Sequence, residues 1–155
     1  MNNTRGLKIY RQQICLLIVI SLNICCGLAP KPDELKIEET KRIWQTIPIY
    51  SGMTETGAGS IPEGSPLVIA KTYKSDANLA AVQQFYVQQL APAGWQFLED
   101  REVKDRGRIR GEQLLEFTKG SYRLTIEFAG ERRADLGWDY AVELSPLNYW
   151  MEKVD

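Results

Sequence analysis

The chain has 155 residues, enough for one domain of ordinary size with little left for a second. Hydrophobic residues make up 44% and charged residues 25%, which is typical of globular proteins and argues against wholesale disorder. The 19 Lys and Arg residues nearly balance the 20 Asp and Glu residues, which argues against a protein built mainly to bind nucleic acid. Histidine is absent, and this excludes Ser–His and Cys–His nucleophile pairs, imidazole metal ligands and histidine general bases.

The first 29 residues differ in composition from the rest of the chain. Arg5, Lys8 and Arg11 precede an apolar run over residues 14–22, and no acidic residue occurs in this segment. A basic start, a short apolar stretch and an exit with small residues are the layout of a secretory signal. The run is shorter than the roughly 18 apolar residues that usually span a bilayer. The sequence predicts that residues 1–29 are a signal peptide, with an uncleaved membrane anchor as the alternative.

The three cysteines, Cys15, Cys25 and Cys26, all lie in this first segment. The rest of the chain therefore forms no internal disulfide and depends on its hydrophobic core. Cys25 and Cys26 stand where a bacterial lipoprotein signal carries its lipidated cysteine, and residues 22–25 resemble that motif except for the branched Ile24. Both are candidate lipidation sites, or else they are apolar residues of the signal. The expected location is the cell envelope, outside the cytoplasm and associated with the membrane, or secretion after cleavage.

Residues 30–66 are expected to form a polar tether followed by a loop. Residues 33–42 are strongly charged and would be solvated. Residues 43–50 are apolar but interrupted by Pro48, which favours an extended segment lying on the domain. Residues 51–66 are rich in Gly, Ser, Thr and Pro, a composition typical of a loop.

The clearest pattern begins at Leu67, where β-branched and apolar residues predict a strand over residues 67–73. Ser75 or Asp76 is expected to cap the helix that follows. An apolar stripe recurs along that helix at helical spacing, and Pro92 and Gly94 end it. The stripe consists of Leu79, Val82, Tyr86 and Leu90, with Phe85 beside it.

The last third of the chain alternates between apolar and polar residues, as in antiparallel strands with one wet face. Strands are expected at residues 95–102, 115–117, 122–129 and 138–145. The helix is expected to cover their apolar face, because both apolar surfaces need burial. The aromatic residues assigned to that buried face are Trp95, Phe97, Tyr122, Phe128, Trp138 and Tyr140.

The predicted fold class is α+β. A compact domain over residues 67–147 would consist of a strand, one amphipathic helix and a four-stranded antiparallel meander, with the helix packed on one face. Residues 148–155 would form a C-terminal tail.

Paired residues mark the helix and its exit, namely Phe85-Tyr86, Gln89-Leu90 and Gly94-Trp95. The segments PIYSG at residues 48–52 and FTKG at residues 117–120 accompany them. Through these motifs, about residues 47–145 resemble a class of small exported bacterial proteins, many of them lipoproteins of unknown function. The resemblance implies the fold and supplies no catalytic residue.

The sequence predicts no catalytic residue, no cofactor and no metal site. Zinc and copper would lack their usual ligands, since the chain has no histidine and its body has no cysteine. Glu99, Asp100 and Glu102 are candidates for paired acid–base chemistry. Their neighbours Arg101 and Lys104 favour a solvated strand edge instead.

A basic run over residues 104–111 is the most distinctive charge feature. It carries four cations and one acid in a domain that is otherwise acidic, and the cations are Lys104, Arg106, Arg108 and Arg110. One hypothesis is that they contact anionic lipid headgroups or an anionic wall polymer. The alternative is a mobile hairpin loop whose charges discourage pairing at a strand edge.

These features together predict a membrane-tethered or secreted, non-enzymatic domain of the cell envelope that acts through protein or envelope contacts. Expected partners are the membrane, through the N-terminal segment, and an envelope protein or anionic lipid, but not nucleic acid. The alternative is a small-ligand binder or a carboxylate-based enzyme with a cleft beside the loop at residues 51–66, since long loops over a rigid sheet often carry function.

Overall fold

The computed structural model describes residues 32–57, 65–105, 107–147 and 149. The chain divides into two units, Met1–Pro32 and Asp33–Asp155, and nearly all described residues belong to the second. The predicted signal segment, with Cys15, Cys25 and Cys26, lies outside the described residues. Arg106 and most of the predicted C-terminal tail lie outside them as well. Within the described part of the chain, no helix has the length and apolar character needed to cross a bilayer.

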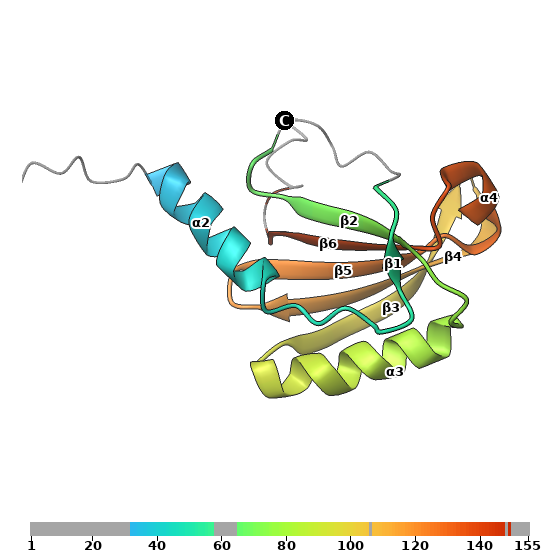
Figure 1. Ribbon diagram of the computed structural model, residues 1–155, viewed down its shortest axis with the longest axis horizontal. Helices are drawn as coiled ribbons and strands as arrows, with labels where there is room; N and C mark the ends of the chain where they lie inside the picture. Colours follow the sequence, from blue (N-terminus) through green and yellow to red (C-terminus); the bar gives the residue numbers. More distant parts are fainter. Residues whose placement is uncertain (1–31, 58–64, 106, 148, 150–155) are drawn as a thin grey trace, which may run out of the picture. The chain divides into compact units, whose positions relative to one another are not determined.

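A single antiparallel sheet organises the second unit (Figure 1). Its six strands lie in the order β1-β2-β6-β5-β4-β3 among the described residues. The strands are β1 (Thr54–Glu55), β2 (Ile69–Lys74), β3 (Gln96–Asp105), β4 (Arg108–Lys119), β5 (Tyr122–Phe128) and β6 (Tyr140–Pro146). The helices are α2 (Pro32–Trp44), α3 (Leu79–Leu90) and α4 (Arg133–Leu136), and two 3-10 turns occur at Ala91–Ala93 (η1) and Gly130–Arg132 (η2).

The α+β class is confirmed, but the sheet is larger than the predicted four-stranded meander. The leading strand β2 joins it by pairing with the last strand, β6, so that Tyr73 lies opposite Tyr140. The short strand β1 then pairs with β2 and extends the same edge. Two helices beyond the predicted one, α2 and α4, complete the unit.

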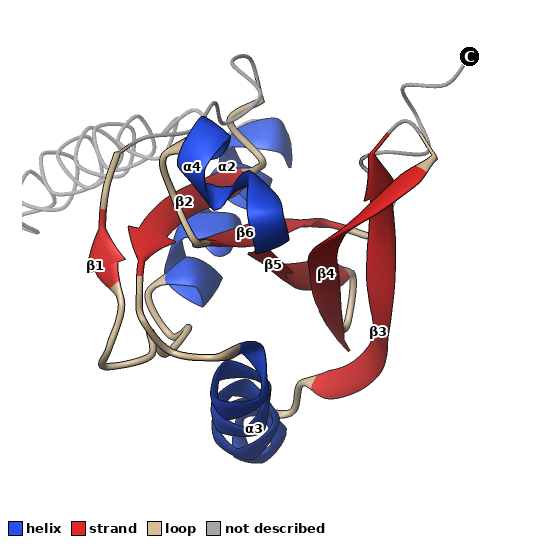
Figure 2. Ribbon diagram, turned by 90° about the vertical axis from the view of Figure 1, so that its right-hand side faces the viewer, coloured by secondary structure: helices blue, strands red, loops and turns tan. Residues whose placement is uncertain are grey.

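Alternation along the strands gives the sheet two different faces. The inner face packs against α3, and Figure 2 shows the sheet curving around that helix. Leu115, Leu124, Ile126 and Val142 are fully buried there. The residues between them in sequence, such as Thr125, point to the opposite side, which is called the outer face below.

The helix α3 presents the predicted stripe to the inner face. Val82, Tyr86 and Leu90 are almost completely buried, and Leu79 is partly buried against the same core. Phe85 is only half-buried, at the rim of the stripe. The strong burial explains why this amphipathic pattern could be recognised in the sequence.

The predicted helix cap was wrong. Asn78 is the N-cap, and its Oδ1 accepts a hydrogen bond from the Ala81 N–H at 2.9 Å. Ser75 stands too early, because its own N–H donates to Asp139 Oδ2 at 3.0 Å and holds the chain beside β6. The N-cap therefore lies three residues after Ser75, at Asn78.

The segment assigned to a tether supplies part of the core. Residues 33–44 are helical, and Ile43 and Trp44 at the end of α2 pack against the core. Ile47 is buried, and the ring of Tyr50 meets that of Phe85 at 5.4 Å. This segment therefore lies on the domain, as expected for residues 43–50, but its first two residues are helical.

The predicted loop over residues 104–111 is mostly strand. The ladder between β3 and β4 continues to the pairs Lys104–Ile109 and Asp105–Arg108, so the turn is very short. Gly107, with a φ of +81°, adopts the left-handed conformation that such a turn requires.

Three aromatic residues depart from their assignment to the buried face. Phe97 is 42% exposed because it lies on the edge strand β3, where no further strand covers it. Phe128 is half-buried at the end of β5. Trp138 is buried but precedes β6, and it lines a groove over the outer face of the sheet. Trp95, Tyr122 and Tyr140 belong to the core as predicted.

Candidate functional site

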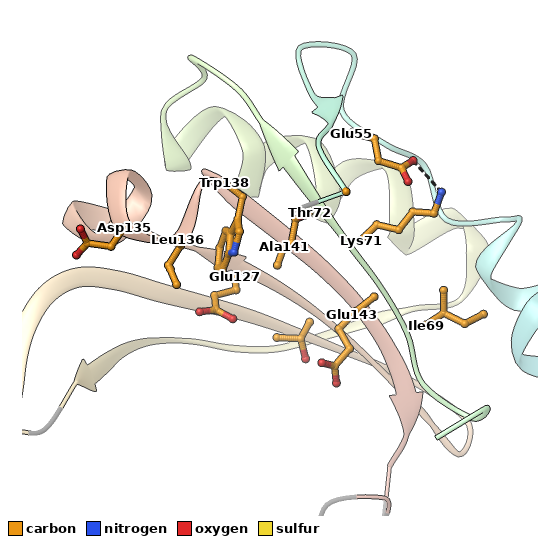
Figure 3. A pocket seen from close by; sticks show the side chains of 13 residues that line it. Glu55, Ile69, Lys71, Thr72, Glu127, Asp135, Leu136, Trp138, Ala141 and Glu143 are labelled. Carbon is orange, nitrogen blue, oxygen red and sulfur yellow. Dashed lines mark hydrogen bonds and ion pairs between the residues drawn. The ribbon is translucent and has the colours of Figure 1, made fainter. Parts of the chain in front are cut away.

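A groove of about 550 Å³ lies over the outer face of β2, β5 and β6 (Figure 3). The start of the loop after β1 and the helix α4 form its two sides. Its size falls in the range of small-molecule sites. The lining residues are Glu55, Gly57, Ile69, Ala70, Lys71, Thr72, Thr125, Glu127, Asp135, Leu136, Trp138, Ala141 and Glu143.

Small side chains create the hollow. The register places Thr72 beside Ala141 and Ala70 beside Glu143, and Thr125 pairs with Glu143 from the other side. Four of the outward positions on three adjacent strands thus carry Ala or Thr, which leave room above the sheet. The inner face has large buried residues at the alternate positions, which pack closely.

Helix α4 is held at one side of the groove by two glycines. Gly137, with a φ of +76°, ends the helix in the left-handed conformation. Gly130, with a φ of +56°, lies against the backbone of residues 110–111, where a Cβ would come within 2.5 Å of the Arg110 carbonyl oxygen. Only glycine permits this approach, which positions Asp135 and Leu136 beside the sheet.

Carboxylates dominate the charge of the lining. Among the described lining residues, Glu127, Asp135 and Glu143 contribute carboxylates from β5, α4 and β6, while Glu55 and the cation Lys71 line the groove at its β1–β2 edge. Lys71 Nζ lies 2.7 Å from Glu55 Oε2, so its charge is already matched. The groove therefore has a net negative charge, concentrated on β5, β6 and α4.

Glu127 and Glu143 lie close together at the centre. Glu127 pairs with Ala141 across the ladder and Thr125 pairs with Glu143, so the two glutamates are diagonal neighbours on one face. Figure 3 shows both side chains on that face, with Leu136 and Trp138 beside Glu127. Partial burial raises the pKa of Glu127 above its ordinary value, and the charges of Glu112 and Glu143 raise it further, while Arg132 opposes them.

A buried ion pair stands behind Glu127. Glu112, which is 1% exposed, has one carboxylate oxygen 2.9 Å from Nη1 of Arg132. Neither oxygen of Glu112 accepts a hydrogen bond from the described residues, so this contact is an ion pair alone. The pair neutralises part of the charge beside the groove without removing its acidic character.

The residues predicted to contact an anionic surface lie elsewhere. Lys104 and Arg108 are exposed at the tip of the β3–β4 hairpin, and Arg110 is half-exposed on β4. The structure brings these three to one arm of the sheet, while Arg106 and the candidate lipidation sites Cys25 and Cys26 fall outside the described residues.

The acidic candidates on β3 lie on the exposed edge strand. Asp100 Oδ2 accepts a hydrogen bond from Gln83 Nε2 at 3.1 Å, and Glu99 lies 3.5 Å from the guanidinium of Arg101. Glu102 is exposed. No group of three or more Asp, Glu or Cys residues in the described ranges is arranged to hold a metal ion.

Sequence reasoning did not identify the groove, although part of its signal was visible. The alternation of apolar and polar residues over 122–129 and 138–145 predicts that Glu127 and Glu143 point away from the core, but their closeness depends on the β5–β6 register. Trp138 was assigned to the core because it continues the alternation of β6, whereas α4 and Gly137 place it before that strand.

No family model, no curated protein and no solved structure matches this chain.

Proposed function

We propose that this chain is a non-enzymatic domain of the cell envelope, tethered to the membrane or secreted through its N-terminal segment, that binds a cationic ligand in the outer-face groove. The envelope location rests on the basic and apolar layout of residues 1–29. The ligand-binding role rests on the groove. It lies beside the described start of the loop at residues 51–66, which borders it through Gly57.

One observation supports this proposal above the others. A hollow floored by small side chains has carboxylates around it, and Lys71, the one cation among its described lining residues, is engaged by Glu55. A ligand ammonium or guanidinium group placed near Glu127 and Glu143 would reduce the electrostatic repulsion between them. Removing this repulsion would contribute to the affinity for a cation. Leu136 and Trp138 offer an apolar wall for the rest of such a ligand.

We favour binding over catalysis because the groove offers charge and shape but few reactive groups. A general acid or base would need a nucleophile or a second group at hydrogen-bond distance from the reacting atoms. Lys71, the lining amine, is held by Glu55 at 2.7 Å. Recognition of a cation requires only the carboxylates that are present.

The test is calorimetric titration of the full chain in a neutral detergent with two matched probes. The first is the N-acetylated dipeptide amide Arg-Leu, and the second carries citrulline in place of arginine, which keeps the shape but removes the charge. We expect the arginine probe to bind at least about tenfold more tightly, the scale of one charge-assisted hydrogen-bonded pair. Equal affinities for the two probes would rule out the proposal.

A variant pair locates the binding. Glu127→Gln together with Glu143→Gln should abolish the preference for arginine, because both central charges are removed while side-chain volume is kept. Glu102→Gln, on the exposed edge strand, is the matched control and should leave the preference intact. A preference that survives the double substitution would place the cation site elsewhere.

A further inference from the structure

The β3–β4 hairpin ends in a two-stranded arm. Pairing between β4 and β5 begins at Gln113. In the part of β4 before it, the described pairs are Arg108 with Asp105 and Ile109 with Lys104 of β3, and the β3–β4 register is irregular between these pairs and Gln113. Beyond that point the arm rests on Gly130, which contacts Gly111 at the base of the arm. The tip, where Lys104 pairs with Ile109, therefore extends past the end of β5 (Figure 2).

An apolar side chain is exposed at this tip between cations. Ile109 is 58% exposed, the highest value among the large hydrophobic residues that the structure describes as exposed. Its sequence neighbour Arg108 and its cross-strand partner Lys104 are exposed as well. A single exposed isoleucine is ordinary, but one with a cation opposite it on the same face and an exposed cation next to it in sequence has the composition of membrane-contact segments.

We propose that this tip docks on an anionic lipid bilayer, with Ile109 entering the boundary between headgroups and acyl chains while Lys104 and Arg108 meet the phosphates. Charge complementarity selects this occupant. The described residues 103–111 carry three cations and one acid, whereas the groove on the outer face is acidic and would be repelled. The inference rests on the membrane location in the proposed function but is independent of the groove.

Docking would orient the domain on the membrane. The arm is held by the β3–β4 pairs near its tip and by the Gly111–Gly130 contact at its base, so a tip held at the surface fixes the direction of the sheet that follows it. Ile109 and the two cations act together here, because an apolar side chain alone or a charge pair alone gives only weak, reversible binding.

The experiment is hydrogen–deuterium exchange on the full chain mixed with vesicles of neutral phosphatidylcholine or of an equal mixture with phosphatidylserine. Peptides that carry Lys104 and Ile109 should exchange more slowly with the anionic vesicles only. The difference should vanish at 1 M salt, where the Debye length falls to about 3 Å. Equal exchange with both lipids would overturn the inference.

Variants separate the tip from general attraction. The double substitution Lys104→Ser and Arg108→Ser should weaken binding of the tip to anionic vesicles at least about tenfold. Each cation near an anionic surface contributes about fivefold to this affinity. Ile109→Ser should weaken binding too, whereas Leu98→Ser should not, although Leu98 is 56% exposed on the partner strand β3. Loss of the effect with Leu98→Ser equal to that with Ile109→Ser would contradict insertion at the tip.

The two proposals fail in different ways. A chain that remains in the aqueous fraction with both kinds of vesicle would overturn the membrane location and this inference together. A chain that sediments with the vesicles while its tip exchanges freely would overturn the docking of the tip alone.

Discussion

Leu124 and Thr125 are neighbours in β5, yet they belong to opposite faces with opposite physical character. Leu124 is fully buried under α3 together with Ile126, whereas Thr125 and Glu127 face the groove and stay partly exposed. The inner face achieves stability by close packing. The outer face leaves space and carries several carboxylates, which suits a binding surface and which a core avoids.

The largest expected effect tests the inner face. Leu124→Ala should lower the free energy of unfolding by about 2–5 kcal/mol, because it removes buried methyl groups and leaves a cavity. Thr125→Ala, one residue along the same strand, should change it by no more than about 0.5 kcal/mol. Urea unfolding followed by circular dichroism measures both. Similar losses for the two variants would mean that the faces do not differ as described.

A glycine pair tests how the wall of the groove is held. Gly130→Ala should lower the free energy of unfolding by about 2–4 kcal/mol. Alanine would be strained at this left-handed φ, and its Cβ would clash with the backbone of Gly111 and Arg110. Gly120→Ala has the same strain, with a φ of +57°, but its Cβ meets no described atom within 4 Å. It should cost about 1–2 kcal/mol. Thermal unfolding measures the stability loss of each variant. Equal losses would show that the close backbone contact of Gly130 does not contribute to stability.

The rim of the core should respond less than its centre. Phe85 is half-buried, with its ring 5.4 Å from that of Tyr50 and 5.2 Å from that of Tyr86. Phe85→Ala should therefore cost about 1–3 kcal/mol, less than the roughly 3–5 kcal/mol of a fully buried phenylalanine. Val87→Ala, on the exposed side of α3, is the control and should cost about 0.5 kcal/mol. A loss of more than about 4 kcal/mol from Phe85→Ala would place this ring in the centre of the core.

The inner face could be predicted from the sequence because burial leaves a periodic trace. The stripe of α3 and the alternation in β5 and β6 record the packing directly, so their contact was expected. The strand β1 has two residues and no such trace, and its pairing with β2 depends on the path of the chain after α2. Trp138 shows the opposite error, since the alternating pattern begins at Trp138 but the strand β6 begins only at Tyr140.

The outer face could not be predicted because its character comes from register. Glu112, Glu127 and Glu143 lie on three strands, and nothing in their spacing reveals that they are neighbours. The same holds for Arg132, which reaches Glu112 only because Gly130 allows the chain to approach β4. Close backbone approach and cross-strand proximity are properties of the folded chain, whereas sequence periodicity reports only which side of a strand a residue occupies.

The smallest expected effect has the opposite sign and concerns Glu127. Its pKa in the folded protein is raised above the ordinary value of 4.5, first by burial and then by the charges of Glu112 and Glu143. Well below pH 4.5 the carboxyl group is neutral in both states and costs nothing. As the pH rises above that value, the unfolded chain releases its proton first, so the folded state loses stability and does not regain it. Glu127→Gln, which stays neutral, should therefore make the protein more stable than the wild type at pH 7.

The pH dependence distinguishes this cause from a general effect of the substitution. The gain in unfolding free energy should disappear near pH 3, where the wild-type carboxyl group is protonated as well. It should also shrink in a Glu143→Gln background, because one of the two repelling charges is then gone. The four proteins to compare are the wild type, Glu127→Gln, Glu143→Gln and the double variant. Chemical unfolding at pH 3 and pH 7 gives the unfolding free energy of each. If Glu127→Gln were instead less stable at pH 7, Glu127 would be held by a favourable contact, and the groove would lack the repulsion that a bound cation is proposed to relieve.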